Sequence, residues 1–178
     1  MKSTLKYRLL SISLAASSII TLGPMARAGH CFLCRKAALD MPISISVGVV
    51  KTPEFSVKRG NYEITIQVER RLPLGQLDCL MGTDMLSQAS HCKKFDYEAL
   101  LEADWMVWDG DHVVAQGNVS GEHGKGSVSD DTMDRYLGSF KGESNKKYVL
   151  EVKFKKDGTA LNVTHPHLIV MLTKPTDI

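Results

Sequence analysis

The chain has 178 residues, of which 22 are basic and 20 are acidic, and 43% are hydrophobic. This length suits a single domain with one core, because domains commonly contain about 100 to 200 residues. Lysine and arginine form no dense block in the sequence, and tracking a phosphate backbone requires clustered positive charge. We therefore expect no nucleic-acid partner.

The first 28 residues are predicted to be a cleavable signal peptide. Basic residues precede an apolar run from Leu9 to Leu22, and Gly23-Pro24 breaks that run. Ala26 and Ala28 supply the small side chains that a signal peptidase needs, so cleavage is expected after Ala28. Removing the four basic residues of this segment leaves 18 basic and 20 acidic side chains, so the mature chain is expected to be slightly acidic and periplasmic.

No membrane anchor is expected on the mature chain. The apolar run of the leader is too short for a transmembrane helix, which needs about 20 residues. A lipid-modified cysteine follows a small residue, whereas Cys31 follows His30. The mature protein is therefore predicted to be soluble.

Residues 29–42 are predicted to form an N-terminal arm that carries a C-x-x-C pair, Cys31 and Cys34. Such a pair can cycle between dithiol and disulfide, or bind a metal together with His30. No strand-helix-strand pattern surrounds the pair, and cysteines of exported chains are commonly oxidised. A disulfide is the favoured prediction, and redox or metal chemistry is the alternative.

Residues 43–178 are predicted to form one mainly β domain. Apolar and polar side chains alternate most clearly from Tyr62 to Glu69, which is typical of a strand with one buried face. Asp109-Gly110 and Asp157-Gly158 predict hairpin turns, because tight turns need a positive φ angle. The predicted strands cover residues 43–49, 62–69, 104–109, 112–117, 148–155 and 167–173.

Short helical turns are predicted near residues 96–102 and 131–137, the second ending at Gly138. Several short strands separated by turn residues, without a long helical period, are typical of an antiparallel sandwich. The predicted fold is therefore an immunoglobulin-like β-sandwich with one or two helical turns.

Cys79 and Cys92 are predicted to form a structural disulfide. They flank a segment rich in turn and polar residues, and a bridge there would close a loop of about fourteen residues. In the chain-entropy model this contributes roughly 3 kcal/mol. Four cysteines allow three pairings, however, and the spacing alone leaves them open.

Two histidines and a glycine-rich loop are weaker site candidates. His165 and His167 would share one face of a strand, but Pro166 between them indicates a strand entry, where exposed histidines are ordinary. Residues 121–126 superficially resemble a phosphate loop but lack the Ser or Thr that follows the lysine. We predict neither a metal site nor a phosphate site.

The middle of the chain combines bulky aromatic residues with acidic ones. Trp105 and Trp108 fall on opposite faces of one predicted strand, so at least one should lie in the core. The carboxylates are expected to form a solvated face, although an acidic surface also suits a protein that plugs a basic cleft. These acidic residues are Asp78, Asp84, Glu98, Glu102 and Asp104.

Six blocks of strand and turn residues occur in a characteristic order. They are Phe55–Val68, Leu72-Pro73, Asp78–Gly82, Trp105–Gly110, Leu137–Phe140 and Tyr148–Val152. This set resembles an exported bacterial family that is classified only as a domain of unknown function. The resemblance covers most of residues 40–173 and implies an immunoglobulin-like domain. It brings no active site, and the arm with Cys31 and Cys34 lies outside it.

The sequence contains no recognisable catalytic set, so we expect neither an enzyme nor a bound cofactor. The favoured function is that of an exported, non-catalytic protein-binding protein, most concretely an immunity protein that neutralises a toxin delivered into the periplasm. Its contact loops are predicted at Leu80–His91 and Gly121–Ser129. The alternatives are redox or metal handling by Cys31 and Cys34, and a structural role in the cell envelope.

Overall fold

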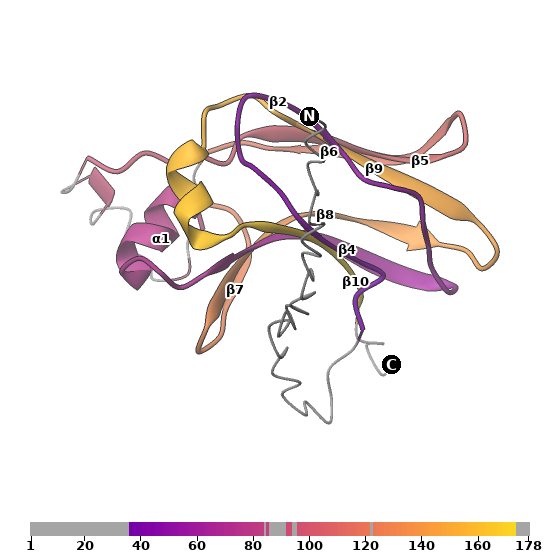
Figure 1. Ribbon diagram of the computed structural model, residues 1–178, viewed down its shortest axis with the longest axis horizontal. Helices are drawn as coiled ribbons and strands as arrows, with labels where there is room; N and C mark the ends of the chain where they lie inside the picture. The colour runs from indigo at the N-terminus through magenta and orange to yellow at the C-terminus, as the bar shows by residue number, and fades with distance from the viewer. Residues whose placement is uncertain (1–35, 84, 86–91, 94–95, 122, 174–178) are drawn as a thin grey trace, which may run out of the picture. The chain divides into compact units, whose positions relative to one another are not determined.

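A computed structural model describes residues 36–83, 85, 92–93, 96–121 and 123–173 of the chain (Figure 1). All of them belong to one compact unit, which spans Cys34–Ile178. The predicted signal peptide and the pair Cys31 and Cys34 lie outside the described residues. No helix in the described part of the chain is long and apolar enough to cross a membrane.

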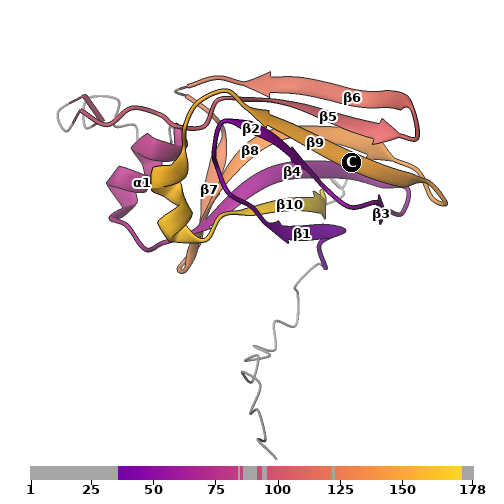
Figure 2. The same ribbon diagram turned by 45° about the horizontal axis from the view of Figure 1, so that its top comes forward.

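Two antiparallel sheets pack face to face as a β-sandwich, which confirms the mainly β prediction (Figure 2). Sheet A has the order β1 (Leu39–Pro42), β10 (His167–Leu172), β4 (Gly60–Glu69), β8 (Thr132–Gly142) and β7 (Gly126–Val128). Sheet B has the order β2 (Gly48–Lys51), β9 (Lys147–Phe154), β5 (Ala103–Asp109) and β6 (His112–Val119), and β3 (Phe55–Ser56) also pairs with β9.

Alternating burial explains why the predicted strands form. In β4 the side chains of Tyr62, Ile64, Ile66 and Val68 are buried in the core, while their neighbours face outward. In β9 the side chains of Tyr148, Leu150, Val152 and Phe154 are buried in the same way. The predictions at 62–69, 104–109, 112–117, 148–155 and 167–173 are confirmed by β4, β5, β6, β9 and β10.

Trp105 packs between the two sheets. It projects inward from β5, is 5% exposed, and lies against Gly117 of β6 and Gly138 of β8. A Cβ atom at Gly138 would overlap the indole ring. Trp108 projects from the other face of β5 and is half-buried. The expectation that at least one tryptophan belongs to the core is confirmed.

Replacing Gly138 with alanine is expected to lower the free energy of unfolding by about 2 kcal/mol, because the core must shift to admit the methyl group. Guanidinium denaturation measures the loss. Ser139→Ala is the matched control, since Ser139 is the next residue of β8 and is exposed. An unchanged midpoint for Gly138→Ala would show that the indole does not fill this space.

The helix predicted at residues 131–137 is wrong, because this segment is the first part of β8. Met133, Arg135 and Leu137 are buried, and the residues between them are more exposed, so the period is two. A charged residue at a buried position concealed this period in the sequence. A bulge in the pairing of β8 with β4 also interrupts the alternation between Tyr136 and Gly138.

The helices α1 (Leu74–Met81) and η1 (Thr159–Thr164), the second a short 3-10 helix, lie elsewhere, side by side at one end of the sandwich (Figure 2). The described residues of 96–102 form no helix, so that prediction is wrong. The backbone of this segment instead forms a hydrogen bond with α1, in which the Leu100 N–H donates to the Leu80 carbonyl at 2.8 Å.

Only one of the two predicted hairpin turns is correct. Asp109 pairs with His112, and Gly110 has a φ of 58°, so β5 and β6 form the expected hairpin. The Asp157-Gly158 hairpin is wrong, because these residues lead into η1, where the Asp157 carboxylate accepts a hydrogen bond from the Thr159 N–H.

The N-terminal strands differ most from prediction. The strand expected at residues 43–49 lies later, as β2 at Gly48–Lys51, because residues 43–47 cross toward η1. The last part of the predicted arm is itself a strand, β1, which pairs with β10 through Leu39 and Val170. Strands β3 and β7 have two and three residues, too few to show a period.

Candidate functional site

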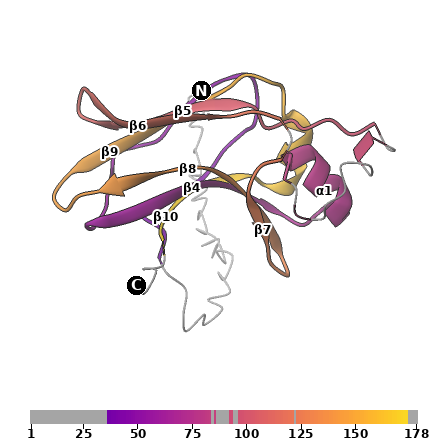
Figure 3. The same cartoon turned by 180° about the vertical axis from the view of Figure 1, so that it is seen from behind.

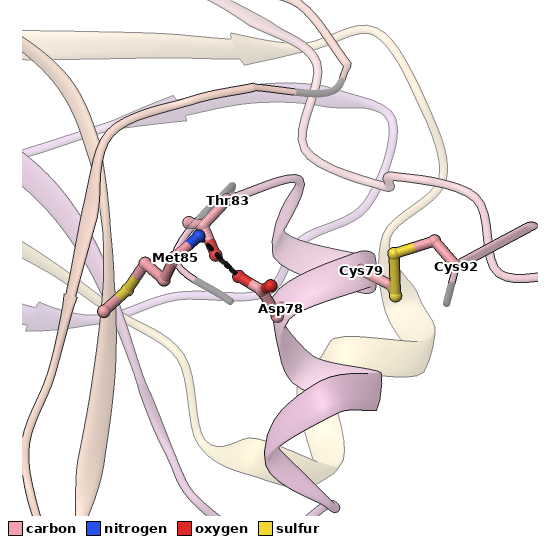
Figure 4. Close-up of a disulfide and its surroundings, with 5 residues drawn as sticks. All are labelled: Asp78, Cys79, Thr83, Met85 and Cys92. Carbon is pink, nitrogen blue, oxygen red and sulfur yellow. Dashed lines mark hydrogen bonds between the residues drawn. A yellow bond between two sulfur atoms is a disulfide. The ribbon is translucent and has the colours of Figure 1, made fainter. Parts of the chain in front are cut away.

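The predicted bridge between Cys79 and Cys92 is confirmed, and it fastens the end of α1 (Figure 4). Leu77 to Met81 are all buried, so this end of the helix packs into the sandwich. Gly82 stops the helix in the left-handed conformation with a φ of 65°. After the bridge the chain returns beside α1, since the Leu100 N–H donates to the Leu80 carbonyl at 2.8 Å.

Asp78 is buried and holds the turn after α1 (Figure 4). Its carboxylate accepts hydrogen bonds from the Thr83 hydroxyl and, at 3.3 Å, from the Met85 N–H. A buried carboxylate needs such donors, because leaving it unpaired would cost several kcal/mol. Asp78 therefore does not belong to an acidic surface.

The buried side chain of Arg135 connects α1 to the loop before β7. It is 2% exposed, and its guanidinium donates to the carbonyl oxygens of Gly82 and Gly121, the second at 3.4 Å. The Gly124 N–H also donates to the Gly82 carbonyl, at 2.9 Å. A side chain at Gly124 would overlap the guanidinium. We call Gly82, Thr83, Gly121, Gly124 and Arg135 the loop junction.

Burial lowers the pKa of Arg135 below the usual arginine value. Within the described part of the chain no carboxylate contacts the guanidinium, and its Nε has no hydrogen-bond partner. Among the described residues, backbone carbonyls compensate the buried charge. This arrangement holds Gly82 beside Gly121 and Gly124.

The loop junction brings together parts of the two predicted contact loops. Gly82 and Thr83 come from Leu80–His91, and Gly121 and Gly124 come from Gly121–Ser129. Leu80 itself is buried in α1, and residues 84, 86–91 and 122 lie outside the described residues. The described residues of the glycine-rich segment pack over Arg135 and lead into the edge strand β7.

Two of the five carboxylates of the predicted acidic face pair with lysines. Asp104 pairs with Lys155 at 2.6 Å, and Glu98 pairs with Lys156. Asp84 lies outside the described residues. Asp78 is buried and Glu102 is half-buried, so the described members of this set do not form an unpaired acidic surface that would plug a basic cleft.

A second candidate surface is the outer face of sheet A, where polar side chains of all five strands form a row. His167 Nδ1 lies 2.6 Å from an oxygen of Asp40. Gln67 donates to one oxygen of Asp134 and Ser127 to the other, both at 2.8 Å. Because His167 pairs with Gln67 in register, the row is continuous from β1 to β7. We call these five residues the polar row.

Two hollows flank the polar row on this face. The first, of about 270 Å³, is lined by Glu63, Thr65, Lys125 and Tyr136 together with Asp134 and its neighbours. The second, of about 190 Å³, is lined by Glu69 and Thr132, by Asp40 and Gln67 of the row, and by both histidines. Sequence reasoning missed this surface, because it depends on the register of strands far apart in the chain.

His165 and His167 lie at the same hollow but bind different carboxylates. His165 ends η1 with a φ of 48°, so it is not a strand residue, and its Nδ1 lies 3.3 Å from Glu69. His167 faces Asp40. Among the described residues no three His, Cys, Asp or Glu side chains are arranged to hold a metal ion.

Glu69 titrates below the ordinary glutamate range, because the Arg71 side chain hydrogen bonds to it and lowers its pKa, with His165 adding to the effect. Any stabilisation from this pairing is present above the ordinary glutamate pKa and is lost as the pH falls through the lowered value. In Arg71→Gln the pKa of Glu69 is expected to rise. Carboxyl NMR titration of both proteins measures it, and an unchanged value would contradict this pairing in solution.

Comparison with known proteins supports the fold alone. The sequence matches no family model and no curated protein. A crystal structure of a protein from Sulfurospirillum deleyianum is similar, with a TM-score of 0.52 and 13% sequence identity. The alignment covers 76% of this chain and 97% of that one. At this identity the similarity extends to the sandwich and carries no activity with it.

Proposed function

We propose that this chain is an exported, non-catalytic binding protein that recognises a protein partner, with an immunity protein against a periplasm-directed toxin as the most concrete case. The observation that carries the proposal is the loop junction. A disulfide, a helix cap and a buried arginine hold the described ends of two distant loops together. Pre-ordering of this kind favours recognition, because less conformational entropy is lost on binding.

Export is supported by two independent features. The N-terminal segment has the pattern of a signal peptide. The Cys79–Cys92 disulfide fits an oxidising compartment such as the periplasm, because cytosolic thiols are kept reduced. We propose cleavage after Ala28 on this basis.

We further propose that the sandwich is a variant of the immunoglobulin-like class. Assigning β4 to β9 the letters B, C, C′, D, E and F gives the neighbours B–E–D and C′–C–F, as in that class. The terminal strands are exchanged, since the C-terminal β10 pairs with β4 and the N-terminal β2 pairs with β9. This exchange is a departure from the usual order.

The partner is tested with matched surface variants of the mature chain, residues 29–178. Val128 of β7 follows the loop junction and is 41% exposed, and Val113 of β6 is 42% exposed near the hairpin at the opposite end (Figure 1). The wild type and Val113→Asp should capture the same protein from periplasmic extract, and Val128→Asp should lose it. Co-expression should then relieve any toxicity of that protein. Equal capture by all three proteins would refute this contact surface.

A further inference from the structure

Two hollows lie on the outer face of sheet A along β4, and we call them together the trough. Strand β7 diverges from the plane of the sheet and borders this face (Figures 1 and 3). Along β4 the outward residues run from Glu63 to Glu69, a length of about 20 Å at the rise of a β-strand. The two hollows follow this direction, and the hydrogen-bonded pair Gln67 and Asp134 divides them.

The first hollow contains polar side chains that are not bonded to other described residues and can therefore bind a ligand. Glu63, Lys125 and Tyr136 line it, and none of their side chains forms a hydrogen bond or ion pair with a described residue. Asp134 is oriented by Gln67 and Ser127, each of which occupies one of its oxygens. Each carboxylate oxygen has a second lone pair, so Asp134 can still accept hydrogen bonds from a ligand.

The mixture of these groups indicates an uncharged, hydroxyl-rich ligand. Phosphate binding is disfavoured, because the hollow has one positive charge, on Lys125, and two negative charges, on Glu63 and Asp134. An apolar ligand would leave the same groups without water or partners, which costs free energy. A hydroxyl both donates and accepts, so it satisfies carboxylate, ammonium and phenol alike. The ring of Tyr136 offers an apolar surface to the C–H face of a sugar.

From this geometry we infer that the trough binds a linear, neutral oligosaccharide, with one part of the ligand against Tyr136 and the next beyond the Gln67–Asp134 pair. The first hollow shares Lys125 and Ser127 with the predicted contact loop Gly121–Ser129, but saccharide binding does not depend on the proposed protein partner. Asp134 acts as a pre-oriented acceptor, because its neighbours hold it before a ligand arrives.

Titration calorimetry on the mature chain tests the inference with cellotetraose, maltotetraose and chitotetraose as probes. At least one should bind, and Tyr136→Ala should weaken it about tenfold, the effect expected for loss of an aromatic contact. Glu63→Gln should also weaken binding. The matched control is Glu151→Gln on the outer face of sheet B, which should leave binding unchanged.

Thermal melts of each variant separate lost binding from lost folding, and Tyr136→Phe, which keeps the ring, should retain most of the affinity. The inference is overturned if the folded wild type binds none of the three saccharides. It is also overturned if Tyr136→Ala and Glu63→Gln bind like the wild type. Binding of tetralysine in place of the saccharides would assign the trough to basic peptides and equally overturn it.

Discussion

Replacing Arg135 with alanine is expected to lower the free energy of unfolding by about 4 kcal/mol. The substitution removes a large buried side chain and leaves the Gly121 carbonyl without its guanidinium donor. The Gly82 carbonyl keeps only the bond from the Gly124 N–H. The loss is moderated because burial of the positive charge is itself unfavourable, as the lowered pKa of Arg135 indicates. Guanidinium denaturation at neutral pH measures the change.

Two further variants identify the cause of this loss. Arg135→Met keeps most of the side-chain volume without donors, so it should cost about half as much as Arg135→Ala. Gly124→Ala should also destabilise, because its methyl group would overlap the guanidinium. In the double variant with Arg135→Ala the overlap disappears, so the two effects should not add. Additive effects would contradict contact between Arg135 and Gly124.

The strands that could be predicted are those in which every inward position is apolar. β4 and β9 satisfy this rule along their length. β8 breaks it, because Arg135 occupies an inward position and a bulge follows at the middle of the strand. The charge is tolerated there because two carbonyls of other segments accept hydrogen bonds from it. Local sequence contains no information about those carbonyls, so the segment was mistaken for a helix.

Helix α1 was not predicted, for a related reason. Five successive residues, Leu77 to Met81, are buried against the rest of the domain, so the helix lacks the one-sided apolar period of an exposed amphipathic helix. Asp78 lies among them, and its acceptor role depends on Thr83 and Met85. The sequence therefore indicated the covalent link between Cys79 and Cys92 but not the helix that carries it.

The two candidate surfaces differ in how far sequence can reveal them. The contact loops were chosen by their turn residues, and parts of both meet at the loop junction. The polar row joins residues as far apart as Asp40 and His167, which are 127 positions apart. Their proximity follows from pairing β1 with β10, and a one-residue shift would turn these side chains to the other face. Such a surface can be identified only when the register of the paired strands is known.

Removing the bridge in the double variant Cys79→Ala/Cys92→Ala is expected to lower the free energy of unfolding by about 3 kcal/mol, because the closed loop no longer restricts the unfolded chain. The two cysteines are 13 positions apart, which sets the size of that loop. Denaturation of the wild type with and without dithiothreitol should give the same difference. Repeating the reduction in Cys31→Ala/Cys34→Ala excludes a contribution from the N-terminal pair, and no effect of reduction there would contradict the prediction.

Hydrogen exchange shows whether the bridge also orders the loop junction. The Gly124 N–H bonds to Gly82 just beyond α1, whereas the N–H groups of β4 lie in the centre of sheet A. If the bridge holds the end of α1 in place, its removal should increase the exchange rate of the Gly124 N–H by a larger factor than the exchange rates in β4. The rates in β4 report only the global loss of stability. Equal acceleration at both places would show that the bridge acts on the unfolded chain alone, and that Asp78 and Arg135 suffice to hold the junction.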